Sequence, residues 1–263
     1  MYFAFLISSL LSLQTYGAEN RGLNPIEDLS VLVQGAQLES NLNVLDSTTS
    51  QEVDLNVQPW GDRFWQLQDG LLASRYADPN YKALKTFQDK HDYVLKKSIE
   101  NILSEPIAKR AADIDLLSPA EKYDLLVGDP QMTLTQTEWA EIDRTAKVGA
   151  LAKWDGICDG GSAASTYFQE PKHEVNVKTA SGENIRFHLT DIKGLEALLW
   201  SSYNLYIPVV GNRCKTKNPA KDENGVIVDP ACAGVNAGAW HIALLNLLGR
   251  RNQVLFINRS SDA

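Results

Sequence analysis

The residues that could do chemistry are most densely gathered around Cys158. This cysteine sits in a glycine-rich turn, and small residues follow it at helical spacing through Ser165. The pattern predicts a loop that runs into a closely packed helix beginning near Cys158. At a helix N-terminus the dipole favours the nucleophilic thiolate, and the amides of the first turn, that of Gly160 among them, can bind an oxyanion. The alternative is an inert, buried cysteine behind a glycine turn.

A cysteine nucleophile needs a histidine as its base. The chain has four histidines, namely His91, His173, His188 and His241. His241 lies beside Trp240 in an apolar run, where a buried imidazole needs a hydrogen-bond partner. The alternative for His241 is a core histidine whose hydrogen bonds are already satisfied.

A hairpin near the end of the chain would supply that partner. We expect Trp240–Leu248 and Gln253–Asn258 to be antiparallel strands. In that register Asn258 and Asp262 are diagonal neighbours of His241, at about 7–8 Å. The sequence then predicts an imidazole oriented by an amide or a carboxylate. A slip of one residue would turn Asn258 to the other face.

Helix signals precede this region. Asp78-Pro79 predicts the start of an amphipathic helix that runs through Ile102. Capping-box sequences at Ser118 and Thr135 predict two more helices. These helices carry no chemistry of their own, so we interpret them as a structural subdomain.

Strand signals follow Cys158. Alternating residues at 173–178 and 184–188, with Ser181-Gly182 between them, predict a β-hairpin. Asp191 is expected to cap a helix that runs through Trp200. The sequence therefore favours an α+β fold.

The composition bounds the class of protein. The chain has 263 residues, a formal net charge of −8 and three cysteines, which is enough for one large domain or two modest ones. The acidic balance argues against the basic surface of a nucleic-acid binder. Three cysteines are too few for a disulfide scaffold or a four-thiolate zinc site. We expect a monomer.

The start of the chain predicts its compartment. Residues 1–18 are uncharged, with an apolar run and small residues near Ala18, which is typical of a secretory signal peptide; the alternative is a short buried helix. No stretch is long enough to span a bilayer. We expect a secreted or periplasmic protein with a flexible leader or pro-segment at 19–57. A helical subdomain at 58–150 and a catalytic core at 151–263 follow, and together they are expected to form one structural unit.

Four stretches of the chain resemble the secreted transglutaminase elicitor family of oomycetes and marine bacteria. The specific motifs are Trp154–Cys158 and Ala239–Asn246, and the stretches Pro59–Pro79 and Leu117–Asp129 add support. The resemblance covers residues 58–262. It implies a papain-like or transglutaminase-like core, in which the nucleophile begins a helix and an antiparallel sheet carries the histidine and its Asn or Asp partner.

The resemblance also implies an activity. Members are protein-glutamine γ-glutamyltransferases, in which a cysteine thiolate attacks a glutamine side chain, ammonia leaves, and an amine takes the acyl group from the thioester. By motif position Cys158 is the nucleophile and His241 the base. Asn258 falls where the family has Asp; an amide can hold the imidazole but not stabilise imidazolium by charge, a part that Asp262 could take.

The surroundings of Cys158 depart from the family. Asp159-Gly160-Gly161 stands where the family tends to have an aromatic residue, and the Asp159 anion works against a neighbouring thiolate. Trp154 either donates its indole N–H to the oxyanion or walls the cleft. We place Trp154, Asp159, Gly160 and Trp240 at the substrate or oxyanion site.

The other two cysteines flank a polar loop. Cys214 and Cys232 are expected to form a disulfide that stabilises this loop by about 3 kcal/mol; the alternative is two free surface thiols. Asp222, Asn224 and Asp229 in the loop resemble a loose calcium site, although a solvated turn explains them better. No other metal or cofactor is expected.

These inferences lead to an exported acyltransferase that acts on proteins or peptides with accessible Gln and Lys. One alternative is a cysteine peptidase or protein deamidase, because water can resolve the same thioester. The other alternative is a catalytically impaired binding module. It is supported by Asp159 and Asn258, which depart from the pattern of the family.

Overall fold

The computed structural model of the chain describes residues 29, 32, 37–49, 52–54, 57–148, 151, 153–202, 210, 214, 216–225, 227–232, 235 and 237–255. These residues are mostly helical, with a small two-stranded antiparallel sheet. The chain divides into a larger unit of residues 54–205 and 256–258 and a smaller unit of residues 1–53, 206–255 and 259–263. These boundaries differ from those of the expected domains, and each unit is described by itself below.

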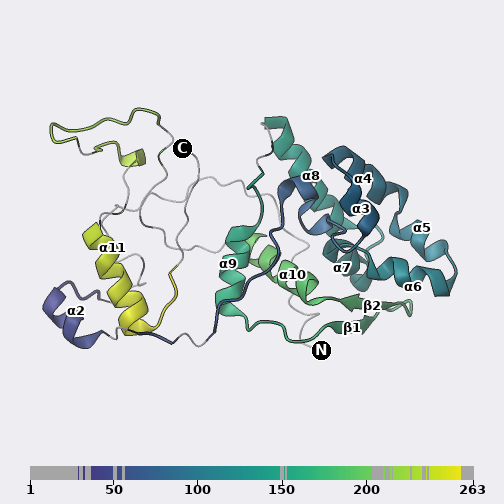
Figure 1. Cartoon of the computed structure of the whole chain (residues 1–263), viewed down its shortest axis with the longest axis horizontal. Coiled ribbons are helices and arrows are strands. Elements are labelled where there is room, and N and C mark those ends of the chain that lie inside the picture. The colour runs from purple at the N-terminus through teal and green to yellow at the C-terminus, as the bar shows by residue number, and fades with distance from the viewer. Residues whose placement is uncertain are drawn as a thin grey trace. The chain divides into compact units, whose positions relative to one another are not determined.

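The larger unit holds a helical array and the sheet (Figure 1). Its helices are η3 (Leu67–Asp69), η4 (Leu71–Ala73), α3 (Pro79–Ala83), α4 (Phe87–Lys96), α5 (Ile99–Ser104), α6 (Ile107–Asp115), α7 (Pro119–Val127), α8 (Thr133–Val148), α9 (Cys158–Tyr167) and α10 (Leu189–Ser202). Strands β1 (Val175–Lys178) and β2 (Asn184–Phe187) pair with Val175 opposite Phe187, which confirms the predicted hairpin.

Two of the predicted helix starts are confirmed in detail. Asp78 accepts a hydrogen bond from the Asn80 amide with Pro79 as the first helical residue. The side chain of Ser118 accepts from the Glu121 amide while Glu121 accepts from the Ser118 amide, which is a complete capping box. Asp191 lies in the first turn of α10, where it accepts from the amide of His188 at 2.8 Å.

The single helix expected from Asp78 to Ile102 is wrong. The structure divides it into α3, α4 and α5, because two polar side chains inside the run start new helices. Thr86 accepts from the Asp89 amide at 3.1 Å, and Ser98 accepts from the Asn101 amide at 3.3 Å. Such local bonds compete with a continuous helix even where the apolar spacing persists.

The capping box expected at Thr135 is also wrong. Helix α8 begins at Thr133, so Thr135 already lies inside it, and its amide and hydroxyl donate to Asp124. Glu138, expected to close the box, is buried and accepts a hydrogen bond from the Leu72 amide at 3.0 Å. The side chains of Thr135 and Glu138 thus form tertiary hydrogen bonds in place of the local bonds of a capping box.

Buried charges lie at the centre of the larger unit. The ammonium of Lys122 on α7 is 2.7 Å from the carboxylate of Asp191 on α10, and both side chains are 0% exposed. Asp191 also accepts from the Tyr76 hydroxyl at 2.8 Å. This network fastens α7 to α10, next to an apolar cluster around Trp65, Leu72 and Trp139.

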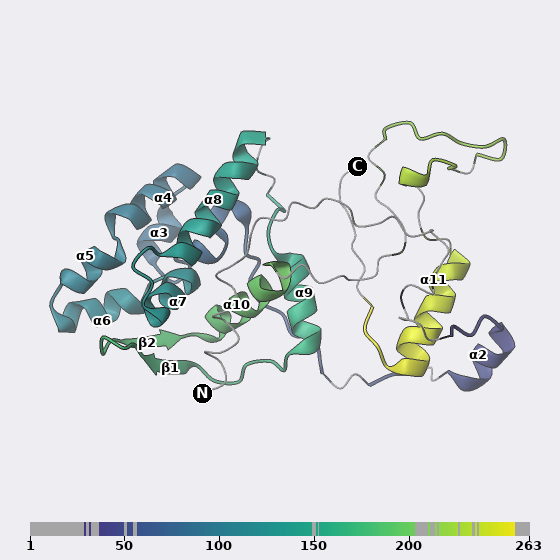
Figure 2. The same ribbon diagram turned by 180° about the vertical axis from the view of Figure 1, so that it is seen from behind.

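The smaller unit contains α2 (Leu42–Thr48), η5 (Pro230–Cys232), α11 (Ala237–Leu244) and a π-helical turn, η6 (Leu245–Arg250). Figure 2 shows η6 continuing from α11. The strand expected at Trp240–Leu248 is therefore wrong, and no strand is assigned at 252–255. A continuous apolar run does not distinguish a buried strand from a helix, and the alanines and leucines of this run favour helix.

The fold class is confirmed only in its coarse form. Helices and a small antiparallel sheet are both present, but His241 lies on a helix, so the expected sheet carrying His241 is wrong. Among the described residues, no helix combines the length and the apolar character needed to cross a membrane.

Candidate functional site

Cys158 is the first residue of α9, as predicted. Its thiol is free and exposed, so the cysteine is not buried as the alternative had it, and its role as a nucleophile stays a prediction. Ile157 occupies the N-cap position and no side chain caps this helix end. The amides of the first turn therefore have no side-chain acceptor, which is the arrangement that an oxyanion site needs.

The loop before Cys158 is fixed by pairing with the segment that precedes η3. The Leu67 amide donates to the carbonyl of Asp155 at 2.8 Å, and Gln66 and Gly156 form an antiparallel bridge. A Cβ atom at Gly156 would lie 2.2 Å from the carbonyl oxygen of Trp65, so only glycine allows this approach. The Trp-Asp-Gly-Ile-Cys motif thus has a packing reason for its glycine.

Helix α9 is held against α10 by a second close approach. The two helices lie side by side in both views (Figures 1 and 2). A Cβ atom at Gly160 would lie 2.0 Å from the carbonyl oxygen of Ala197 and 2.8 Å from Cβ of Ser201. Gly194 in turn contacts the indole of Trp65, where a Cβ would come within 2.7 Å. These contacts set the position of Cys158 through the backbone.

Two other residues expected at the site lie close to Cys158 in sequence. Asp159 is exposed in the first turn of α9, and its Oδ1 lies 3.5 Å from the Ser201 hydroxyl. Trp154 is 53% exposed, four residues before the thiol. Its exposure is compatible with either of the two roles expected for it, the wall of a cleft or a donor to an oxyanion.

His241 and Trp240 belong to the smaller unit. Both are on α11, whose buried face carries Ala239 and Ala243. His241 is exposed and Trp240 is half-buried, so the alternative of a core histidine is wrong. Asn258 and Asp262 lie outside the described residues. The pairing of His241 with either of them therefore stays a prediction, and the hairpin register that motivated it no longer applies.

Asn246 has a structural role that the sequence pattern does not indicate. Its side chain is 1% exposed and pairs with both backbone groups of Glu39: Oδ1 accepts from the Glu39 amide at 2.9 Å, and Nδ2 donates to the Glu39 carbonyl at 2.9 Å. The only signal available was a lone amide within the apolar run from Ile242 to Leu248.

The other histidines have different surroundings. His188 contacts Glu174 at 2.8 Å and Asp115 at 3.3 Å, which places it in a surface cluster of charges at β2. His91 is half-buried, and the centroid of its ring lies 5.0 Å from that of Trp139. His173 is exposed before β1.

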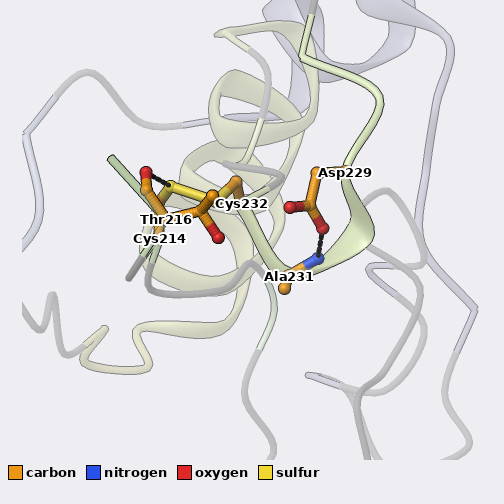
Figure 3. Close-up of a disulfide and its surroundings, with 5 residues drawn as sticks. All are labelled: Cys214, Thr216, Asp229, Ala231 and Cys232. Carbon is orange, nitrogen blue, oxygen red and sulfur yellow. Dashed lines mark hydrogen bonds between the residues drawn. A yellow bond between two sulfur atoms is a disulfide. The ribbon is translucent and has the colours of Figure 1, made fainter. Parts of the chain in front are cut away.

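The predicted disulfide is confirmed. Cys214 and Cys232 are bonded, and Figure 3 shows the bond beside the turn at Asp229. Asp229 accepts from the Ala231 amide and Asp222 from the Asn224 amide, both at 2.9 Å, so both carboxylates support turns. Within the described part of the chain, no three acidic, histidine or cysteine side chains are placed to hold a metal ion.

A free thiol presented by the first turn of a helix defines a candidate cysteine-nucleophile site. The chain belongs to the transglutaminase elicitor family, whose model matches residues 27–263. Membership suggests an enzyme with a transglutaminase-related function. No curated protein and no solved structure among those compared matches the chain.

Proposed function

We propose that the chain is a secreted protein-glutamine γ-glutamyltransferase. The observation that carries this proposal is Cys158, a free, exposed thiol at the uncapped start of α9, held in place by glycine contacts on both sides. Membership of the transglutaminase elicitor family supports the same reaction. The Cys214–Cys232 disulfide is consistent with export to a secreted or periplasmic location.

The proposed reaction has two halves. The Cys158 thiolate attacks the side-chain carboxamide of a substrate glutamine; a C–S bond forms, the C–N bond breaks, and ammonia leaves with a proton from His241. An amine then attacks the thioester carbon, and the thiol is released. The substrates are proteins or peptides with an accessible Gln and Lys.

The surrounding residues have proposed roles. The first-turn amides, including that of Gly160, stabilise the oxyanion, while Trp154 and Trp240 contribute to the substrate site. Asp159 is exposed in the first turn of α9, directly after Cys158 in the chain. Asn258 or Asp262 orients His241. The proposal requires Cys158 and His241 to meet in the active protein.

Covalent labelling tests the reaction. The mature protein is incubated with casein and a fluorescent alkylamine, and incorporation and ammonia release are both measured. Labelling is expected with the wild type, at least 100-fold less with Cys158→Ala, and a similar loss with His241→Gln. His173→Gln is the matched control, because it removes an exposed histidine outside the proposed site and should retain wild-type activity.

Three outcomes would contradict the proposal. Ammonia release without labelling would indicate a deamidase, and cleavage of casein would indicate a peptidase. Failure of iodoacetamide to alkylate Cys158 at neutral pH would show that this thiol is not a nucleophile. It would favour the alternative of a catalytically impaired binding module. Asn258→Asp restores the acid found in the family, so it should raise the rate of labelling; a fall would assign the orienting role to Asp262.

A further inference from the structure

An open cavity of about 670 Å³ lies within the smaller unit. One wall is α2, which contributes Leu42 and Asp46, and the opposite wall is α11 with η6. The proposed base His241 lines it, together with Leu244, Leu245 and Leu248. The lining of the cavity therefore contains an imidazole, a carboxylate and several leucine side chains.

The α2 wall is firmly attached. The buried side chain of Asn246 holds the backbone of Glu39 through two hydrogen bonds of 2.9 Å, and Arg251 donates to the carbonyl of Gln37 at 3.1 Å. Leu45 of α2 is 0% exposed. Bonds to the backbone fix the course of this segment whatever its side chains are, so the cavity has two defined sides.

The charges in the cavity favour one kind of ligand. Of the described residues that line it, Asp46 carries the only carboxylate, and none is a lysine or arginine. A carboxylate in such a site attracts a cation, and leucine side chains gain from contact with methylene groups. A primary alkylammonium ion, such as a lysine side chain, has both features. An anion or a short polar ligand has neither.

We propose that this cavity binds the acceptor amine, with Asp46 as the residue that selects the ammonium group. The inference rests on the proposed transglutaminase reaction. It assigns a binding site to the amine that accepts the acyl group in the second half of that reaction. It also makes the segment around α2 part of the mature enzyme rather than a removable pro-segment.

The chemistry of the step balances. The bound ammonium first loses one proton to solvent through His241 and becomes a neutral amine. Its nitrogen attacks the thioester carbon, a C–N bond forms, and the C–S bond breaks. The second proton of the amine passes through His241 to the departing sulfur, which restores the Cys158 thiol and leaves an isopeptide bond.

Direct binding tests the site without any reaction. Dansyl-cadaverine is titrated into Cys158→Ala protein, which cannot form a thioester, and binding is followed by fluorescence anisotropy. Asp46→Asn should weaken binding at least fivefold, and Asp46→Lys should weaken it further. A dansyl alcohol of the same length, which lacks the ammonium, should bind as weakly to the Asp46-bearing protein as dansyl-cadaverine binds to Asp46→Asn.

Glu39→Gln is the matched control, because it removes one negative charge from the same segment outside the cavity lining. It should leave binding within twofold. Equal weakening by Glu39→Gln and Asp46→Asn would overturn the proposal, because a general charge effect would then explain both. Equal binding of the amine and the alcohol would overturn it as well.

Kinetics separate this proposal from the one on which it rests. With Cys158 restored, Asp46→Asn should raise KM for the amine at least fivefold, while ammonia release by hydrolysis changes less than twofold. Absence of ammonia release from the wild type would reject the transglutaminase reaction, whereas the binding result would still decide the cavity. Unchanged KM in Asp46→Asn would reject the role of Asp46 alone.

Discussion

Gly160 on α9 and Ala197 on α10 approach so closely that a methyl group on Gly160 would lie 2.0 Å from the Ala197 carbonyl oxygen. Because the contact involves backbone, it cannot be relieved by rotating a side chain. The packing of these two helices therefore depends on the absence of a side chain two residues after the proposed nucleophile.

Gly160→Ala is expected to displace α9 and with it Cys158. Overpacking of this kind costs about 1–3 kcal/mol of unfolding free energy, and we expect at least a tenfold loss of amine incorporation. Thermal unfolding and the casein assay measure the two effects. Gly161→Ala is the control: its Cβ would lie 3.9 Å from that of Ala197, an ordinary contact, so it should unfold at the same or a higher temperature and keep its activity.

Lys122→Met is expected to destabilise the larger unit strongly. It leaves the Asp191 carboxylate buried without its cation, and breaking a buried pair from one side costs about 3–5 kcal/mol. Denaturant unfolding gives the value. Lys109→Met breaks an exposed pair with Glu105, and because solvent screens this pair the free energy of unfolding should stay nearly unchanged. Similar losses in the two variants would show that burial of the Lys122–Asp191 pair has no special cost.

Glu138 predicts a pH dependence of stability. Burial is the main cause that raises the pKa of this carboxyl from 4.5 to about 7. Between these pH values the folded state retains a proton that the unfolded state has lost, so the unfolding free energy falls as pH rises through this window. The cost is complete above the folded-state pKa and absent below the unfolded-state pKa.

Glu138→Gln removes that dependence while its amide oxygen can still accept from Leu72. Relative to the wild type, the variant should gain about 1–3 kcal/mol between pH 4.5 and pH 8. Any fixed penalty from the buried amide N–H groups is the same at both pH values, so the change with pH is the readout. Parallel melting temperatures of the two proteins across this range would contradict the prediction.

The disulfide predicts a stability difference in the smaller unit. Replacing Cys214 and Cys232 together by Ala should cost about 3 kcal/mol, because the closed loop no longer restricts the unfolded chain. Urea unfolding of this unit gives the value. The intact protein should react with one equivalent of a thiol reagent when denatured without reductant and with three after reduction, since the chain has three cysteines. Three equivalents without reductant would disprove the pairing.

Local signals predicted the elements whose contacts are local. Ser118 and Glu121 satisfy each other within one turn, and the start of α9 at Cys158 follows from the glycine turn and the small residues behind it. The pairing of Val175 with Phe187 follows from strand alternation and a glycine turn. In each of these cases the deciding interaction lies within one helical turn or one hairpin.

The predictions that the structure contradicts concern segments whose conformation depends on distant contacts, or whose sequence pattern fits both helix and strand. Glu138 has a capping-box position but serves the Leu72 amide, 66 residues away. The run from Trp240 to Leu248 has no periodicity that separates helix from strand, so the face that His241 occupies could not be derived from it. The wall of the cavity that carries Asp46 depends on the two hydrogen bonds between the Asn246 side chain and the Glu39 backbone. No local sequence pattern predicts these bonds.

The pairing of Asn246 with Glu39 has a consequence for the synthesis of the chain. The hydrogen bonds between Asn246 and Glu39 join residues 207 positions apart, which gives the smaller unit a high contact order. At about 5–20 residues per second, a ribosome needs about 10–40 s to travel between them. Residues 54–205 leave the ribosome within that interval and can fold first. Until η6 is synthesised, Leu45 of α2 lacks the residues that bury it. We therefore expect the smaller unit to acquire its fold after residues 54–205 have done so.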